Sequence, residues 1–355
     1  MSSELSALVP VLFGHAAFQQ LNAGCQLGLF ELLHERGPLS AEEVADALRL
    51  PRRSADILLL GTTALGLSTV TDGGYRNGAP IGAAFRDGLW PVLRDIVQYQ
   101  DKIAYQPAAD YVESLRTGQN AGIRHFPGTT RDLYSRLAAV PGLEELFYRG
   151  MHAWSQLSNP VLLAQPDFTR VHRVLDVGGG DAVNAVALAR AHPSLRVTVL
   201  DRPGALEVAR KTIAEAGLEE RVRTHAADIF TDSYPAGHDC VLFAHQLVIW
   251  SPEQNLTLLR KAYDAVEPGG RVLVFNAFTD DDRTGPLYAA LDNVYFTTLP
   301  FRHSTIHRWA DCESWLREAG FTDVGRTAPP GWTPHGVVSG SRPRAAALEH
   351  HHHHH

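Results

Sequence analysis

The sequence predicts an α/β protein in which a mostly helical N-terminal part precedes a mostly parallel sheet with helices on both faces. From residue 172 onward, short apolar runs alternate with amphipathic helical segments, which is the pattern of successive βαβ units. Before residue 166, apolar residues recur mainly at helical spacing. A chain of 355 residues with 45% hydrophobic and 20% charged residues is long enough for about two domains.

Residues 1–85 have the pattern of a winged-helix domain. Apolar residues at helical spacing fill residues 8–33 and predict helices with large apolar faces. Ser40 and Glu43 form a capping-box pattern at the start of the next helix. A further helix is expected over 51–65, and residues 67–77 read as a hairpin.

A winged helix often binds DNA, but this one lacks the side chains for base recognition. Its second helix offers only Arg52 and Arg53 at the start and then the apolar run Ile57-Leu-Leu-Leu60. The formal net charge of −7 also disfavours a broad phosphate-binding surface. We therefore expect no nucleic-acid partner, and we interpret the surplus of apolar helical faces as the interface of a homodimer.

Residues 86–165 are expected to form a helical connector rich in aromatic residues. These aromatics are either core residues or the roof of a substrate pocket, and one helix can do both with different faces. Met151 and Trp154, three residues apart, share one helical face and are candidates for contacting a substrate.

Residues 166–344 carry the predicted sheet. Strands are expected at 172–177, 196–200, 222–227, 239–244 and 271–277, helices at 252–266 and 310–319, and an antiparallel edge pair at 320–324 and 335–339. This order gives a sheet covered by helices on both faces.

A glycine-rich turn follows the first strand, in Val174-Leu-Asp-Val-Gly-Gly-Gly-Asp-Ala182. Gly178 and Gly180 permit a tight turn and let a bulky ligand approach the backbone. Asp201 ends the second strand, where a carboxylate can accept hydrogen bonds from two ribose hydroxyl groups. These features predict a nucleoside pocket.

Three details favour S-adenosylmethionine over a dinucleotide. Asp176 precedes the turn, where a carboxylate suits a cationic amino-acid group and opposes a pyrophosphate. Val183 stands where the dinucleotide fingerprint places its third glycine. The third strand ends in Asp228-Ile229-Phe230, which can bind an adenine amino group and cover its ring.

The remaining composition is that of a cytoplasmic protein. Cys25, Cys240 and Cys312 lie far apart without metal-ligand spacing, so we expect reduced thiols. No run approaches the ~20 apolar residues that span a bilayer, and no membrane association is expected. Residues 345–355 read as a vector scar and a histidine tag.

As a set, these motifs resemble the class I S-adenosylmethionine-dependent O-methyltransferases with an N-terminal winged-helix dimerisation domain, which include plant caffeate-type enzymes and bacterial enzymes acting on natural products. The resemblance covers nearly all of residues 8–340. It rests on Leu175-Asp-Val-Gly-Gly-Gly180, Leu200-Asp-Arg-Pro203, Ala227-Asp-Ile-Phe230, Trp250-Ser-Pro252, Glu267-Pro-Gly-Gly270 and Glu318-Ala-Gly-Phe321. It implies a Rossmann-like methyltransferase sheet, S-adenosylmethionine as cofactor, a small-molecule acceptor and a homodimer formed through the N-terminal domain.

The chain departs from the family at the catalytic base. Family members usually have Leu-His-Asp-Trp after the fourth strand, with the histidine as base, whereas this chain has Leu247-Val-Ile-Trp250. Val248 therefore occupies the base position, and valine cannot take a proton. Asn276 stands where plant members place a glutamate that orients the histidine, and the second such glutamate maps near His303 or Ser304.

His245 is the substitute base that the sequence suggests, because it follows the fourth strand directly. If residues 245–250 were helical, it would lie about one turn before the lost histidine. Alternatively, His245 only hydrogen-bonds or packs below the cofactor. His303 is the second candidate base.

His303 and His307 are four residues apart, so on a helix they could pair as metal ligands with His245. A surface pair or a substrate-binding pair is the commoner arrangement, and we predict no metal. Asp292 and Asn293 match a stretch that lines the acceptor pocket in the family, and they join His303 and His307 as candidate substrate contacts.

The loss of the usual histidine leaves three hypotheses open. The first is O-methylation with His245 or His303 as base, which we favour for a small specialised metabolite. The second is N- or C-methylation driven by alignment of acceptor and methyl group. The third is a relative that retains the cofactor and performs another reaction.

Overall fold

The computed structural model describes residues 3–344, and the predicted scar and tag at 345–355 lie outside the described residues. The chain forms two compact units. The first runs to Tyr105 and includes Glu145–Leu157, and the second contains Gln106–Glu144 and the chain from Ser158 onward. The predicted connector at 86–165 is thus divided between the two units, with the long helix α10 (Leu143–Leu163) contributing to both.

The first unit is mostly helical, and a two-stranded hairpin lies between its helices α5 and α6. Its elements are η1 (Ser3–Leu8), α1 (Val9–Leu12), α2 (Gly14–Leu27), α3 (Leu29–Arg36), α4 (Ala41–Leu48), α5 (Arg52–Ala64), β1 (Ser68–Thr71), β2 (Gly74–Asn77), α6 (Ala79–Arg86), α7 (Trp90–Tyr99) and the short π-helix η2 (Gln100–Ala104). The predicted capping box is confirmed, because Ser40 Oγ accepts the N–H of Glu43 at 3.1 Å and Glu43 Oε1 accepts the N–H of Ser40 at 2.9 Å. The antiparallel pairing of β1 with β2 confirms the predicted hairpin.

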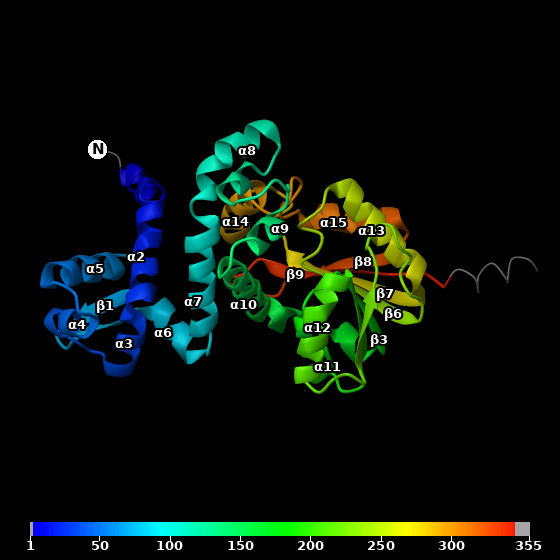
Figure 1. Ribbon diagram of the computed structural model, residues 1–355, viewed down its shortest axis with the longest axis horizontal. Helices are drawn as coiled ribbons and strands as arrows, with labels where there is room; N and C mark the ends of the chain where they lie inside the picture. The colour runs from blue at the N-terminus through cyan, green and yellow to red at the C-terminus, as the bar shows by residue number, and fades with distance from the viewer. Residues whose placement is uncertain (1–2, 345–355) are drawn as a thin grey trace, which may run out of the picture. The chain divides into compact units, whose positions relative to one another are not determined.

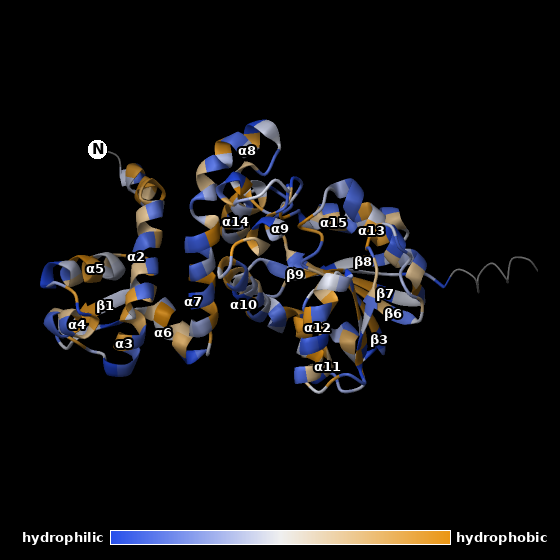
Figure 2. Ribbon diagram, in the orientation of Figure 1, coloured by the Kyte–Doolittle hydropathy of each residue, from blue (hydrophilic) through white to orange (hydrophobic). Residues whose placement is uncertain are grey.

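The first unit exposes a set of large apolar side chains on η1, α1 and α5. Their members are Leu5, Leu8, Val9, Val11, Leu12, Ile57 and Leu60. Val11 on α1 is 76% exposed and Leu60 on α5 is 71% exposed, and Figure 2 shows apolar residues along α5. An apolar surface of this kind marks an interaction site.

The second unit is built on a seven-stranded sheet with the order β5-β4-β3-β6-β7-β9-β8. Its strands are β3 (Arg173–Val177), β4 (Arg196–Asp201), β5 (Val222–Ala226), β6 (His238–Ala244), β7 (Val266–Ala277), β8 (Thr322–Thr327) and β9 (His335–Ser341). The first five strands in this order are parallel, and β9 pairs antiparallel with both β7 and β8. The predicted mostly parallel sheet with an antiparallel edge pair is confirmed.

Helices cover both faces of this sheet (Figure 1). Besides part of α10, the helices of this unit are η3 (Pro107–Asp110), α8 (Tyr111–Thr117), η4 (Ala121–His125), α9 (Leu133–Ala138), η5 (Pro166–Thr169), α11 (Val183–Ala191), α12 (Pro203–Glu215), α13 (Pro252–Ala265), α14 (Leu287–Thr298) and α15 (Trp309–Ala319). One core joins α11 and α12 to β3, β4 and β5, and the other joins α13 and α15 mainly to β3, β6 and β7. None of the helices in the described residues is both long and apolar enough to cross a membrane.

The largest shift of a predicted strand boundary is at the start of β7. The sequence suggested a helix to Val266 that ends at Pro268-Gly-Gly270, but α13 ends at Ala265 and β7 starts at once with Val266. The pairing of β6 with β7 changes register between His238 and Cys240, and this irregularity lets the Pro-Gly-Gly segment lie within the strand. Glycine and proline therefore mark a bulge here and not a loop.

Candidate active site

The carboxyl ends of four parallel strands bring the candidate cofactor residues to one edge of the second unit. Gly178 follows β3, Asp201 ends β4, Asp228 comes shortly after β5 and His245 follows β6. In a parallel sheet with crossover helices, this edge is where ligands bind. The topology therefore brings together residues that are separated by up to 67 positions in the sequence.

The glycine-rich turn after β3 has the backbone that only glycine adopts easily. Gly178 has φ 69° and Gly180 has φ 57°. A Cβ on Gly178 would collide with the side-chain amide of Gln246, whose Nε2 donates to the Gly178 carbonyl at 3.0 Å. Gln246 was not identified from the sequence, because nothing in its neighbourhood marks it apart from the adjacent His245.

Asp201 connects the end of β4 to this turn. Its Oδ2 accepts the N–H of Gly180 at 2.9 Å, and its Oδ1 accepts the N–H of Arg202 at 2.8 Å. The carboxylate is thus held in place by one backbone donor of the glycine turn and one at the end of its own strand.

Asp228 shapes the loop after β5. Its Oδ1 accepts the N–H groups of Phe230 at 2.8 Å and Thr231 at 3.1 Å, and these hydrogen bonds lower the pKa of its carboxyl group. The Phe230 ring packs edge-on against Trp250 with centroids 4.9 Å apart. Ile229 accepts the hydroxyl group of Tyr234 at 2.8 Å through its carbonyl oxygen.

Asp176 is the most unusual carboxylate in the second unit. Its side chain is 1% exposed, and neither carboxylate oxygen has a hydrogen-bond partner within residues 3–344. Burial, together with the smaller effect of the neighbouring Asp201 and Asp181 charges, raises its pKa from 3.8 to about 7. A buried carboxylate without a partner fits a ligand that brings a cationic group.

His245 lies at the end of β6 in a strained backbone conformation with φ 57°. Its N–H donates to the Phe275 carbonyl at 2.8 Å, and its Nε2 is 3.3 Å from Ser158 Oγ. Burial lowers its pKa to about 4, so the imidazole is neutral at neutral pH. The helix considered for residues 245–250 is wrong, because Leu247–Ile249 form a turn.

His335 at the start of β9 lies beside His245, and Asn276 near the end of β7 is a second buried polar residue at this edge of the sheet. The His335 ring faces His245 with centroids 5.7 Å apart, and burial together with the nearby His245 lowers the His335 pKa to about 3. Its Nδ1 and the Oδ1 of Asn276 have no partner in the described chain, although the two side chains are only 6% and 2% exposed. His335 was missed from the sequence; the available signal was a histidine at the start of an otherwise apolar strand.

Val248 points into an apolar cluster with Ala277, Ala289 and Ile306. The position at which related enzymes carry a basic histidine is therefore part of the core here. No group at that position can accept a proton.

The helix α14 carries two of the candidate substrate contacts, Asp292 and Asn293, and only the Asn293 side chain is hydrogen-bonded in the described chain. Burial raises the pKa of Asp292 to about 7, and no hydrogen bond to its carboxylate occurs within residues 3–344. Asn293 Oδ1 instead accepts the N–H of Ile306 at 2.7 Å and the Thr305 hydroxyl group at 3.3 Å. Asn293 therefore fixes the loop that follows α14.

His303 and His307 do not form the helical pair that a metal site would need. Residues 301–308 are turn and coil, so the condition of a helix is not met. His303 is exposed, whereas the ring of His307 packs on Trp315 and its Nε2 lies 3.4 Å from the Asn255 amide. Within the described ranges, no cluster of three or more histidine, cysteine or acidic side chains could hold a metal ion.

Met151 and Trp154 belong to the first unit. Met151 is 36% exposed, and Trp154 packs edge-on against Tyr99 with centroids 5.0 Å apart. They share a helical face as expected.

Comparison with known proteins identifies the family. Residues 109–322 match the O-methyltransferase domain, and residues 9–83 match the O-methyltransferase dimerisation domain. The chain belongs to the O-methyltransferase family. It is 44% identical to L-tyrosine C(3)-methyltransferase from Streptomyces lavendulae over 94% of this chain and 92% of that protein. It is 36% identical to 3-hydroxy-5-methyl-1-naphthoate 3-O-methyltransferase from Streptomyces sahachiroi over 91% of each.

A solved structure agrees on the fold. Human N-acetylserotonin methyltransferase in complex with SAM superposes with a TM-score of 0.81 at 23% identity, covering 97% of this chain and 99% of the human one. The family model and the 44% identical relative show that the chain is an S-adenosylmethionine-dependent methyltransferase, as the sequence predicted. The unpartnered Asp176 carboxylate and the open glycine turn fit this cationic cofactor.

Proposed function

We propose that this enzyme methylates a small phenolic metabolite in natural-product biosynthesis, at a ring carbon beside the hydroxyl group. The observation that carries the proposal is the weak base at the end of β6. His245 is neutral with a pKa of about 4, and Val248 is packed in an apolar cluster. The 44% identical relative, named for methylation at C3 of L-tyrosine, supports the same position.

The cofactor supplies an electrophilic methyl group when it is bound. We assign its binding to five residues at the carboxyl edge of the sheet. Asp176 would face its ammonium group, Gly178 and Gly180 would leave room for its chain, Asp201 would accept its ribose hydroxyl groups, and Phe230 would cover its adenine. Each role follows from charge or from space on the described residues.

The acceptor chemistry needs little from the protein beyond alignment and a hydrogen-bond acceptor. A phenol ring is already nucleophilic at the carbon next to the hydroxyl group. A hydrogen bond from that hydroxyl group to His245 increases the electron density at this ring carbon. The new carbon–carbon bond replaces a ring hydrogen, so one proton is released for each methyl group transferred. A neutral imidazole of low pKa can assist this loss without first forming a full phenolate.

Asp292 supports an acceptor that carries an ammonium group. Its carboxylate has a pKa raised to about 7 by burial and makes no hydrogen bond in the described chain. An ammonium group would stabilise the ionised carboxylate. An aromatic amino acid such as tyrosine offers both the phenol and this group.

The test is incubation with methyl-labelled S-adenosylmethionine and either L-tyrosine or 3-(4-hydroxyphenyl)propionate, which lacks the amine. NMR of the product distinguishes a ring methyl group from a methoxy group. We expect ring methylation of tyrosine and much slower reaction of the acid. Labelled methoxy product from both acceptors would contradict the proposal.

O-methylation is the second candidate. It is supported by the 36% identical relative, whose name places the methyl group on oxygen of a hydroxynaphthoate. His245 would then accept the hydroxyl proton directly. In the same assay this candidate predicts a methoxy product, with larger bicyclic phenols as the better acceptors.

We also propose that the enzyme is a cytoplasmic homodimer formed through the first unit. The match to the dimerisation domain and the exposed apolar side chains on η1, α1 and α5 support this assembly. The three cysteines are free thiols, which suits a reducing compartment.

A further inference from the structure

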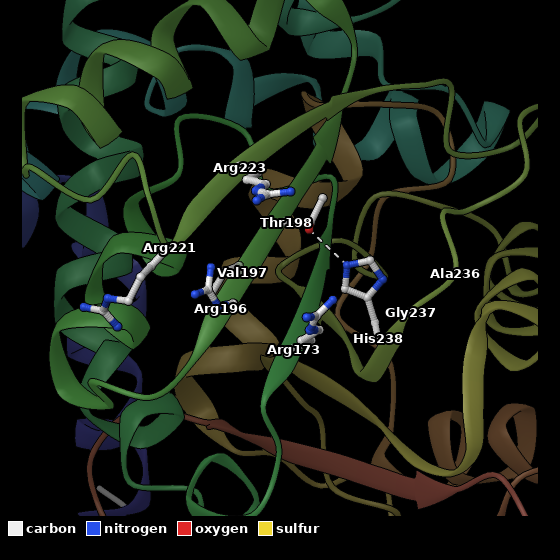
Figure 3. Close-up of a pocket in the computed structure, with 9 residues that line it drawn as sticks. All are labelled: Arg173, Arg196, Val197, Thr198, Arg221, Arg223, Ala236, Gly237 and His238. Atoms are coloured by element: carbon white, nitrogen blue, oxygen red, sulfur yellow. Dashed lines mark hydrogen bonds between the residues drawn. The ribbon is translucent and has the colours of Figure 1, made fainter.

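The amino-terminal edge of the sheet, opposite the candidate active site, contains a cavity of about 250 Å³ (Figure 3). Its polar lining comes from Arg173, Arg196, Thr198, Arg221, Arg223 and His238. We propose that this cavity binds the phosphate group of a small ligand. The proposal is independent of the acceptor and of the site of methyl transfer.

The cavity exists because one part of the sheet lacks a covering helix. The connection from β5 to β6, residues 227–237, contains no helix. The core formed with α13 and α15 includes Leu200 of β4 and no residue of β5. The same face of these two strands is therefore left open toward their amino ends.

Strand register places three arginines on this open face. Arg173 of β3 is opposite Arg196 of β4, and Arg223 of β5 is opposite Thr198 of β4. Side chains two residues apart on a strand share a face, so Arg196 and Thr198 lie on the same side of β4. Figure 3 shows these side chains on three neighbouring strands.

The arginines of the cavity are not ion-paired in the described chain, and the nearby Asp239 carboxylate is held by the backbone N–H groups of His172 and Arg173 at 2.8–3.1 Å. No carboxylate lines the cavity, and none of its four arginines forms an ion pair within residues 3–344. The guanidinium groups of Arg173 and Arg223 also make no hydrogen bond to the described residues. Like charges on adjacent strands destabilise a sheet, and a bound anion would remove this repulsion.

The other two arginines are held by backbone carbonyl groups. Arg196 Nη1 donates to the Glu220 carbonyl at 3.1 Å, and Arg221 Nη1 donates to the carbonyls of Pro193 at 2.9 Å and Leu195 at 3.2 Å. These bonds fix one nitrogen of each guanidinium group. Their positive charge is therefore held at the rim in a defined position.

His238 forms a neutral wall of the cavity. Burial lowers its pKa, its Nδ1 is 3.2 Å from the Pro235 carbonyl and its Nε2 is 3.0 Å from Thr198 Oγ1. Because a carbonyl oxygen accepts, Nδ1 carries the proton and the Thr198 hydroxyl group donates to Nε2. The tautomer of His238 is thus fixed by its surroundings.

Protection of an edge strand does not explain this cluster. Charged side chains often block association at the edge of a sheet, and β5 is an edge strand. Arg173 lies on β3, however, two strands further in. Charges needed only for edge protection have no reason to extend across three strands.

The volume of the cavity and the hydrogen-bond donors of its arginines favour a phosphate group as the ligand. A volume of about 250 Å³ holds roughly eight water molecules, which suits a phosphate and a few attached atoms. Arginine guanidinium groups bind phosphate oxygens through paired, charge-assisted hydrogen bonds. A carboxylate ligand would use fewer of the available donors.

The proposal is tested by calorimetric titration of the full chain with inorganic phosphate, pyrophosphate and glycerol 3-phosphate. All buffers have equal ionic strength, set with sodium chloride. The variant Arg173→Gln/Arg223→Gln is compared with Arg190→Gln/Arg210→Gln, which removes the same charge from exposed arginines on α11 and α12. Circular dichroism melting verifies that both variants are folded.

We expect saturable binding to the wild type and to the control, and binding at least about tenfold weaker in the Arg173/Arg223 variant. Equal binding of glycerol 3-phosphate and phosphate would identify a phosphate ester as the ligand class, whereas binding of the inorganic anions alone would identify the free anion. An absence of saturable binding with all three probes would overturn the proposal. So would an equal loss of affinity in both variants, because it would reveal attraction by net charge alone.

Discussion

The substitution Asp176→Asn should make the cofactor-free protein more stable, and the gain should grow with pH. The Asp176 pKa is about 7 in the folded protein against an ordinary 3.8, so the folded state binds this proton more tightly than the unfolded chain. The wild type therefore loses stability as the pH rises from about 4 to about 7. About three pKa units correspond to roughly 4 kcal/mol at pH 8, and roughly 3 kcal/mol of this develops between pH 5 and pH 8.

The measurement is urea denaturation of the wild type and the variant at several values between pH 5 and pH 8. All other titrating groups are common to both proteins, so the difference in free energy of unfolding isolates Asp176. Asp228→Asn is the matched control, because hydrogen bonds lower the Asp228 pKa. Stability from a lowered pKa is fully present above the ordinary value, so the control difference should be flat in this range.

We expect the wild type to bind S-adenosylmethionine more tightly as Asp176 ionises near pH 7, and the same variant to bind it more weakly and without this increase. A stability difference that does not change with pH would refute the account of a buried carboxylate without a partner. An unchanged cofactor affinity would refute its role in binding.

Three more outcomes follow from the structure. Gly178→Ala should weaken cofactor binding by about tenfold or more, measured by calorimetry, since the position has positive φ and an added Cβ meets Gln246. His245→Ala should lower kcat by at least about 100-fold with cofactor affinity nearly unchanged, whereas the exposed His303→Ala should retain wild-type kcat; equal rates would remove His245 as the proton acceptor. Leu60→Glu should convert the dimer to monomer in light scattering without loss of helical circular dichroism, because Leu60 is 71% exposed on α5.

The sequence was sufficient for the sheet because its signals are local. Apolar runs, the glycine turn and the acidic strand ends each occupy a few consecutive residues, and parallel topology then brings Asp176, Asp201 and Asp228 to one edge. The strand boundaries differ from the predicted ones mainly where a bulge keeps Pro268-Gly-Gly270 within β7. Periodicity does not reveal such a register change.

The acceptor side of the site was harder to predict, because its geometry depends on distant contacts. His335 lies beside His245 only because β9 pairs with β7 in the register that joins His335 to Ala277. The expected position of His245 assumed a helix over residues 245–250, but the chain forms a turn after β6. His307 resembled a ligand in the sequence, but the structure surrounds it with Asn255 and Trp315.

Three unpartnered polar side chains of the second unit lie at the carboxyl edge of the parallel strands, where the candidate cofactor residues meet. Asp176, Asn276 and His335 are each nine-tenths or more buried there with an unsatisfied atom. A buried polar atom without a hydrogen bond destabilises a protein by about 1–3 kcal/mol. These groups therefore lower the stability of the folded protein, which indicates that they serve its function. His335→Leu should therefore raise the free energy of unfolding by about 1–2 kcal/mol while lowering kcat for the phenolic acceptor. A variant that is less stable than the wild type, or equally active, would show that His335 serves the fold and not the acceptor.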